Sequence, residues 1–233
     1  MRITILTGAG ISADSGIATF RDADGLWENH RVEDVASPAA FRRDPQLVQR
    51  FYDLRREAVQ QAEPNAAHRA LAKLERELGA AHGDDAVTII TQNIDDLHER
   101  GGSRNVIHMH GELLSALCTS CEGRHRWKGS LIDGPDCPSC GIATLRPDIV
   151  WFGENIYHTE AIYRALEDCD VFAVIGTSGQ VYPAAGLAAE AAQRGARTVL
   201  LNLESTGGLF DDEQLGPAAE IVPVWVDELL TEI

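Results

Sequence analysis

The chain has 233 residues, enough for one large domain or for one domain with a small lobe. Its 36 acidic and 20 basic residues give a net charge of −16, which argues against nucleic acid and anionic membrane as partners. No apolar run approaches the length of a membrane span. The first strand follows Met1 almost directly and leaves no room for a signal peptide, so we predict a cytoplasmic protein.

The first predicted element is a strand over residues 3–7 that ends in the loop Gly8-Ala9-Gly10. Gly8 allows a tight turn, Gly10 allows close approach to a pyrophosphate, and Ala13 would let the next helix pack on the sheet. An ordinary strand–turn–helix shows the same pattern. The acidic residue that a dehydrogenase places about twenty positions later is missing, because residues 22–36 are polar and rich in turns. A ribose must therefore be held elsewhere.

Helices and strands alternate over much of the remaining chain. Helices are expected at 45–62, 64–78 (ended by Gly79), 159–167, 183–194 and 224–230, with a short turn at 38–41, and strands at 86–91, 106–108, 171–175 and 198–203. This alternation predicts an α/β fold with a Rossmann-like, mostly parallel sheet and helices on both faces. Ligands of such sheets bind at the carboxyl ends of the strands.

Residues 112–146 break this alternation and contain four of the five cysteines. Cys118-x-x-Cys121 and Cys137-x-x-Cys140 are separated by fifteen residues, a spacing that predicts four thiolates around one structural zinc. A site with all four positions filled by protein stabilises and does not catalyse. Iron, or a pair of redox dithiols, are the alternatives. Cys169 is expected to be a buried thiol.

Two further polar stretches lie near predicted strand ends. Residues 91–95, Thr-Gln-Asn-Ile-Asp, suit either ligand binding or the capping of a following helix, by Asp95 in particular. His108 and His110 flank Met109. A histidine near a nucleotide suits a general base because its pKa is near neutral, whereas a structural role is the plainer interpretation of either ring.

Together these motifs resemble the signature of the sirtuins, which are NAD-dependent protein lysine deacylases. The resemblance extends from about residue 3 to about residue 230. It includes the glycine loop, Thr19-Phe20-Arg21, residues 91–95, His110-Gly111, the paired Cys-x-x-Cys, residues 176–178 and Asn202. It implies a Rossmann-like part formed by residues 1–37, 63–111 and 147–233. It also implies a small lobe formed by a helical insertion, 38–62, and a zinc-binding module, 112–146. NAD and acyl-lysine would enter the cleft between the two.

The resemblance also implies roles for individual residues. The catalytic residues would be His110, as the general base, with Asn93 and Asp95. Gln92, Asn93 and Asp95 would hold the nicotinamide ribose and amide. Asn202 or Glu204 would hold the adenine ribose in place of the missing acidic residue. NAD, consumed as a co-substrate, would contact Gly8, Ala9, Gly10, Ser12, Asp14, Thr19, Phe20, Arg21, Trp27, Gln92, Asn93, Ile94, Asp95, Gly176, Thr177, Ser178, Asn202, Leu203, Glu204 and Ala218. The substrate backbone would pair with Val150, Trp151, Phe152, Gly153 and Glu154. One structural zinc would be bound by Cys118, Cys121, Cys137 and Cys140.

The substrates implied are acyl-lysine proteins or peptides. Tyr52 and Arg55 share a helix face and resemble the Tyr-x-x-Arg of the sirtuin branch that acts on acidic acyl groups such as succinyl. Ala36 matches the small residue of that branch's acyl pocket. The plainer interpretation is a packed Tyr52 and a solvated Arg55. The implied reaction removes acetyl and acidic acyl groups and yields nicotinamide, O-acyl-ADP-ribose and free lysine. A protein ADP-ribosyltransferase, a nicotinamide dehydrogenase and an NAD-sensing module are the alternatives.

Overall fold

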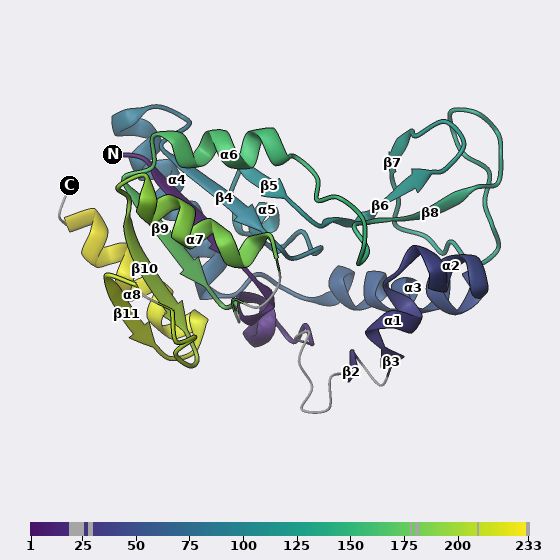
Figure 1. Cartoon of the computed structure of the whole chain (residues 1–233), viewed down its shortest axis with the longest axis horizontal. Coiled ribbons are helices and arrows are strands. Elements are labelled where there is room, and N and C mark those ends of the chain that lie inside the picture. The colour runs from purple at the N-terminus through teal and green to yellow at the C-terminus, as the bar shows by residue number, and fades with distance from the viewer. Residues whose placement is uncertain (19–25, 28–29, 178, 180–181, 209, 232–233) are drawn as a thin grey trace.

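A computed structural model of the chain describes residues 1–18, 26–27, 30–177, 179, 182–208 and 210–231. The molecule has a larger lobe built on one sheet and a smaller lobe beside it (Figure 1). Thr19, Phe20, Arg21 and Ser178 lie outside the described residues, and so does the side chain of Trp27. Among the helices described, none is long and apolar enough to cross a membrane.

Six parallel strands form the sheet of the larger lobe, in the order β11-β10-β9-β1-β4-β5. Their bounds are β1 Ile3–Thr7, β4 Val87–Thr91, β5 Val106–His108, β9 Val171–Ile175, β10 Arg197–Asn202 and β11 Asp212–Leu215. In chain order, β4 and β5 are added on one side of β1, and β9, β10 and β11 are then added on its other side. The point where the strand order reverses therefore lies between β1 and β9, where a doubly wound sheet opens a crevice.

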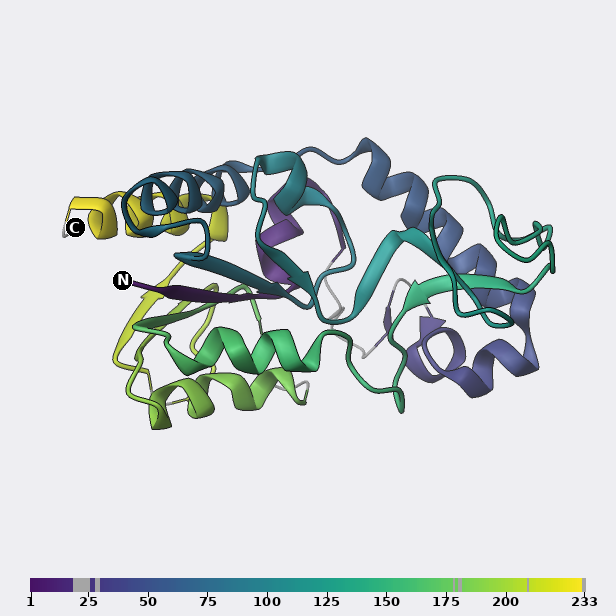
Figure 2. The same cartoon turned by 90° about the horizontal axis from the view of Figure 1, so that it is seen from above.

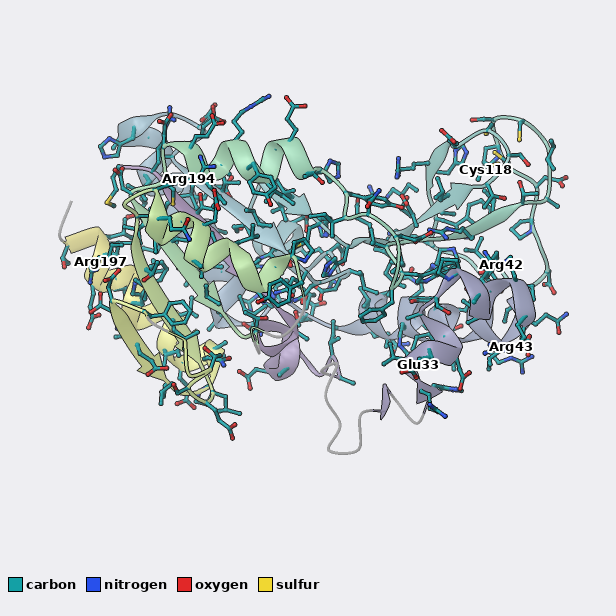
Figure 3. All side chains as sticks on the ribbon, viewed as in Figure 1. Glu33, Arg42, Arg43, Cys118, Arg194 and Arg197 are labelled. Atoms are coloured by element: carbon teal, nitrogen blue, oxygen red, sulfur yellow. The ribbon has the colours of Figure 1, made fainter. Side chains whose placement is uncertain are left out.

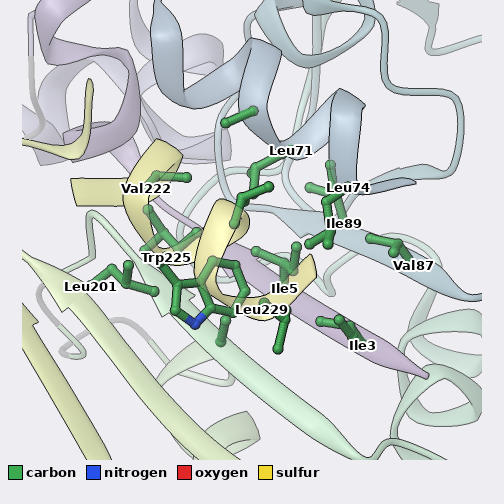
Figure 4. Close-up of a cluster of buried hydrophobic side chains, with 14 of the residues drawn as sticks. Ile3, Ile5, Leu71, Leu74, Val87, Ile89, Leu201, Val222, Trp225 and Leu229 are labelled. Atoms are coloured by element: carbon green, nitrogen blue, oxygen red, sulfur yellow. The ribbon is translucent and has the colours of Figure 1, made fainter. Parts of the chain in front are cut away.

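Helices cover both faces of this sheet, as predicted. The helices α4 (Ala66–His82) and α8 (Ala218–Thr231) lie on one face, and α6 (Thr159–Glu167) and α7 (Ala184–Gln193) lie on the other (Figure 2). Successive strand side chains alternate between faces. Ile3 and Ile5 thus pack with α4 and α8, as Figure 4 shows, whereas Leu6 packs with α6 and α7. Burial on both faces explains why these strands are almost continuously apolar.

The smaller lobe combines the helical insertion with the cysteine-bearing segment. Its helices are α1 Val32–Val35, α2 Pro38–Arg43 and α3 Pro45–Gln61, and its sheet has the order β7-β6-β8, with β6 Gly111–Cys118, β7 Arg124–Arg126 and β8 Leu145–Ile149. Two short strands, β2 Leu26–Trp27 and β3 His30–Arg31, pair with each other, and the helices η1 Ala9–Ser15 and α5 Leu97–Gly101 follow β1 and β4. Phe51 and Tyr52 of α3 pack against Leu113, Ile149 and Trp151, so the two sequence segments share one core.

Several elements differ from the sequence-based expectation. The helix α4 continues through Gly79, because Leu78 and its other apolar residues are buried against the sheet, and it ends before Gly83. The terminal helix begins at Ala218 and contains Pro223, because buried Val222, Trp225 and Val226 hold it on the sheet. The strand β8 was not predicted, because its sequence contains Arg146, Pro147 and Asp148. The segment predicted as a turn at 38–41 is the helix α2, and the polar edge strand β11 was not predicted.

Candidate functional site

A cleft of about 940 Å³ lies at the carboxyl ends of β1, β4, β9 and β10 and continues into the smaller lobe. Gly8, Gly176 and Asn202 line it from the larger lobe, and Tyr52 and Trp151 line it from the smaller one. A site between two lobes at the reversal of strand order is the expected ligand site of this architecture.

The glycine loop that follows β1 packs directly on the loop that follows β9. The Gly8 N–H donates to the Ile175 carbonyl (3.0 Å), and the Gly10 N–H donates to the Gly176 carbonyl (2.8 Å). A Cβ on Gly10 would lie 2.7 Å from the Gly176 Cα, and a Cβ on Gly176, whose φ is +61°, would lie 2.4 Å from the Ile11 nitrogen. Loop packing alone therefore requires these glycines, before any pyrophosphate is considered.

The segment after the glycine loop corrects one prediction. It forms the 3-10 helix η1, in which Ile11 and Ser12 are buried and Ala13 is exposed. The prediction that Ala13 packs on the sheet is therefore wrong, because the tighter 3-10 turn directs other residues inward. Asp14 is also exposed, and its carboxylate accepts from the Ala219 N–H (3.3 Å). Two of the residues predicted to contact NAD, Asp14 and Ala218, are not among the described residues that line the cleft.

The loop after β4 carries a buried polar network. The Asn93 side-chain amide donates to the Ser12 hydroxyl (3.1 Å), which donates to the Asp95 carboxylate (3.1 Å). The same carboxylate accepts from the Leu97 N–H (3.1 Å) at the start of α5. Burial raises the pKa of Asp95. Asp95 thus bonds the first N–H of a helix and also lines the cleft with Gln92, Asn93 and Ile94.

The two histidines have different surroundings. His110 lines the cleft, and its Nδ1 lies 3.1 Å from the Gln92 carbonyl oxygen. A carbonyl only accepts, so Nδ1 carries the hydrogen and Nε2 keeps its lone pair in the neutral ring. Burial lowers the pKa of His110, more than the Gln92 carbonyl raises it.

His108 instead is buried, with Nε2 2.7 Å from the Glu99 carboxylate and Nδ1 3.2 Å from the Asn93 carbonyl oxygen. Burial acts to lower the pKa of His108, but the hydrogen bond and charge of Glu99, the charge of Glu112 and the Asn93 carbonyl together outweigh it, and the pKa is raised. The contacts of His108 favour a structural role, whereas His110 lines the cleft and keeps a lone pair on Nε2.

The segment from Val150 to Glu154 crosses between the lobes, and all five of its residues line the cleft. The Val150 N–H donates to the His110 carbonyl (2.9 Å), and the Phe152 N–H donates to the Ala36 carbonyl (3.0 Å). These bonds tie the segment to the histidine loop on one side and to the helical insertion on the other. The Phe152 side chain is exposed, whereas Trp151 is buried.

The three residues predicted to contact the acyl group, Tyr52, Ala36 and Arg55, have different surroundings. Tyr52 and Ala36 line the cleft, and the Tyr52 hydroxyl accepts from the Trp151 indole N–H (3.1 Å). Burial raises the pKa of Tyr52 well above its usual value. Arg55 is buried, so its interpretation as a solvated charge is wrong. Its guanidinium donates to the Phe51 carbonyl (2.6 Å) and lies 3.1 Å from the Phe51 ring centroid, and among the described residues it does not line the cleft.

The four predicted metal ligands meet at the far end of the smaller lobe, where Figure 3 labels Cys118. Their sulfur atoms all lie within 4.8 Å of one another, and the pairs Cys118–Cys140 and Cys121–Cys137 are 3.7 Å apart. A tetrahedron with Zn–S bonds of about 2.3 Å has edges of about 3.8 Å, so the set fits zinc. The same separations exclude disulfide bonds between these pairs. His125 supports the set, with Nε2 3.3 Å from the Cys137 sulfur.

Of the predicted ligand-binding residues, the cleft brings together Gly8, Ala9, Gly10, Ser12, Gln92, Asn93, Ile94, Asp95, Gly176, Thr177, Asn202, Leu203, Glu204 and those of the smaller lobe named above. Sequence reasoning missed Ile17, Ala18, Ile149, Asn155, Ile156, Thr159, Tyr163, Tyr182 and Pro183, which also line it. No residue type marks them. The nearest signal was position, since Ile149, Asn155 and Ile156 flank the segment 150–154.

Comparison with known proteins identifies the family. The model described as Sir2 family matches residues 8–183. The chain belongs to the Sir2 family. It is 54% identical over 234 residues to a protein of Salmonella typhimurium named NAD-dependent protein deacylase, covering 98% of this chain and 84% of that one. It is 55% identical over 236 residues to the Leishmania major protein named NAD-dependent protein deacylase SIR2rp3, covering 99% and 96%.

Solved structures show the same fold. A Sir2 homologue in complex with NAD matches with a TM-score of 0.89 and 43% identity, over 99% of this chain and 90% of that one. A Sir2 protein bound to an acetylated peptide matches with a TM-score of 0.81 and 30% identity, over 97% and 92%. The predicted sirtuin resemblance, and the predicted fold of a Rossmann-like sheet with a small cysteine-bearing lobe, are confirmed.

Proposed function

We propose that this Sir2-family chain is an NAD-dependent protein lysine deacylase whose substrates are NAD and acyl-lysine peptides. The observation that carries the proposal is the cleft in which His110, the loop 92–95 and the glycine loop meet at the reversal of strand order. The names of the relatives and the two ligand-bound Sir2 structures support it.

The donor set of the cleft fits NAD. Asn202 and Glu204 at the end of β10 offer partners for the adenine ribose, and the amide of Asn93 and the carboxylate of Asp95 offer partners for the nicotinamide ribose. NAD supplies the ADP-ribose that accepts the acyl group. The Rossmann-like part, residues 1–37, 63–111 and 147–233, would supply the NAD contacts, whereas Ala36, Tyr52 and residues 150–154 would face the peptide and its acyl group. The cytoplasmic location stays a prediction.

His110 is proposed as the general base. Its Nε2 lone pair takes the proton of a ribose hydroxyl, and the Gln92 carbonyl stabilises the imidazolium that results, because it accepts from Nδ1. The lowered pKa keeps the ring neutral before the reaction. The four cysteines would hold one zinc, which stabilises the smaller lobe and takes no part in the chemistry.

We further propose that acidic acyl groups such as succinyl are removed as well as acetyl. Tyr52 and Ala36 support this, because they line the cleft at the smaller lobe. Arg55 lies about one turn further along α3, where its Nη1 donates to the Phe51 carbonyl, and its side chain would have to turn toward the cleft to bind an acyl carboxylate. A guanidinium and a phenol together offer three hydrogen bonds to one carboxylate.

Mass spectrometry of the products from acetyl- and succinyl-lysine peptides with NAD tests the proposal. Free lysine, nicotinamide and O-acyl-ADP-ribose are expected. ADP-ribose on the target protein would indicate a transferase, absorbance of NADH a dehydrogenase, and NAD binding without nicotinamide release a sensing module. As control, His110→Ala should lower turnover by about 10²–10⁴-fold while NAD binding persists. Near-normal turnover of that variant would refute the assignment of the base.

A further inference from the structure

We propose that Trp151 is a positioning residue for acyl specificity, because its indole N–H sets the Tyr52 hydroxyl as a hydrogen-bond donor to the distal carboxylate of an acidic acyl group. The inference rests on the proposed function, and in particular on the removal of acidic acyl groups. Trp151 and Tyr52 lie 99 positions apart in the chain and meet only in the folded lobe.

The hydrogen bond between Trp151 and Tyr52 has only one possible direction. The Trp151 Nε1–H lies 3.1 Å from the Tyr52 hydroxyl oxygen, and an indole nitrogen can only donate. The phenol oxygen therefore accepts from Trp151, and its own hydrogen must point away from the indole. Burial raises the pKa of Tyr52, so the phenol keeps that hydrogen at physiological pH. A carboxylate can only accept, and it is the partner that a fixed donor favours.

Trp151 is itself held in place by its neighbours. The Arg146 guanidinium lies 4.0 Å from its ring centre, and the two Arg146 amino groups donate to the two Glu154 oxygens (2.9 and 3.0 Å). Glu154 in turn accepts from the Trp151 backbone N–H (2.9 Å). The Phe41 ring packs against the indole with its centroid 5.2 Å away. These contacts fix the orientation of the indole N–H, and the Trp151 side chain is only 2% exposed.

A fixed phenol donor stabilises an acyl group that ends in a carboxylate and offers nothing to the methyl end of an acetyl group. Loss of the indole bond removes the restraint that Trp151 places on the orientation of the hydroxyl. We expect this to cost about tenfold in kcat/KM on a succinyl substrate relative to an acetyl substrate, which is the scale of one charge-assisted hydrogen bond.

The experiment is a double-mutant cycle with Trp151→Phe, Tyr52→Phe and the double variant, and it measures kcat/KM on paired succinyl- and acetyl-lysine peptides. Trp151→Phe is expected to lower both rates, with the succinyl rate falling about tenfold further. In the Tyr52→Phe background the same change should not alter the succinyl-to-acetyl ratio. Trp127→Phe is the matched control, because that indole N–H also bonds inside the smaller lobe, to the Ser130 carbonyl (3.3 Å), and Trp127 does not line the cleft.

Equal falls on both substrates, or independent effects in the double variant, would overturn the inference. If Trp151→Phe does not fold, the ¹⁵N-labelled indole resonance of Trp151 in the wild type gives the second measurement. That resonance should shift on Tyr52→Phe and on binding of the succinyl peptide, and shift less with the acetyl peptide; the same shift with both peptides contradicts the inference. A wild type that removes acetyl but not succinyl overturns the inference and leaves deacylation standing, so the two failures are distinguishable.

Discussion

Removal of the Arg56 guanidinium is expected to destabilise the smaller lobe through a buried ion pair. Arg56 and Asp53, one turn apart on α3, form this pair, and their side chains are 1% and 8% exposed. Asp53 also accepts from the Ser130 hydroxyl (2.6 Å) and the Leu131 N–H (3.1 Å) of the cysteine-bearing segment. Arg56 donates to the Leu113 carbonyl (3.0 Å). Burial lowers the pKa of Arg56, although Asp53 opposes the shift.

Arg56→Met leaves the Asp53 carboxylate buried without its counter-charge. Loss of one partner of a buried pair costs about 3–5 kcal/mol, and we expect about 3 kcal/mol because Asp53 keeps its bonds to Ser130 and Leu131. For a chain of this size that lowers Tm by about 6–12 °C. Thermal unfolding followed by circular dichroism measures it. Arg50→Met is the matched control on the exposed face of α3 and should change stability by less than about 0.5 kcal/mol.

The double variant Asp53→Asn with Arg56→Met decides whether the pair is the cause. With the charge of Asp53 removed, the further loss of Arg56 should cost distinctly less than it does alone. Additive losses, or a Tm of Arg56→Met equal to that of Arg50→Met, would refute the reasoning. Because α3 also carries Tyr52, the change should weaken succinyl turnover as well as stability.

Three further predictions concern the metal, the acyl group and pH. Cys137→Ser should lower thermal stability and activity together, because metal binding to such a module is largely folding free energy; a metal analysis without zinc, or full stability after chelation, would contradict it. Arg55→Met should lower kcat/KM for a succinyl peptide about tenfold or more and affect the acetyl peptide much less; equal losses would mean that Arg55 supports the fold. The rate should rise with pH and level off below the usual histidine pKa of about 6.5, because the base must be unprotonated and the pKa of His110 is lowered. A pH–rate profile of kcat/KM with its acid limb above pH 7 would count against His110.

Much of the larger lobe could be predicted from local patterns. The strands at 3–7, 171–175 and near 198–203 are apolar because both faces of the sheet are covered, and that pattern is visible in the sequence. The smaller lobe was harder to predict. Its strand β8 has a fully buried sequence that contains Arg146 and Asp148. Partners elsewhere in the chain make that burial favourable: Glu154 pairs with Arg146, and Arg124, Ser115 and Tyr157 bond to Asp148.

The candidate site also has a part that could be predicted from the sequence and a part that could not. The sequence by itself determined the residues whose chemistry depends on spacing along the chain: the glycines after β1, the two Cys-x-x-Cys pairs, and a histidine just after a strand. Only the tertiary structure decided which side chains face the cleft. It placed His110 there and His108 against Glu99, turned Ala13 to solvent, and put the Arg55 guanidinium on Phe51. It also joined Trp151 to Tyr52. The physical reason is that the direction of a side chain depends on the neighbours that pack around it, and those neighbours come from segments far apart in the chain.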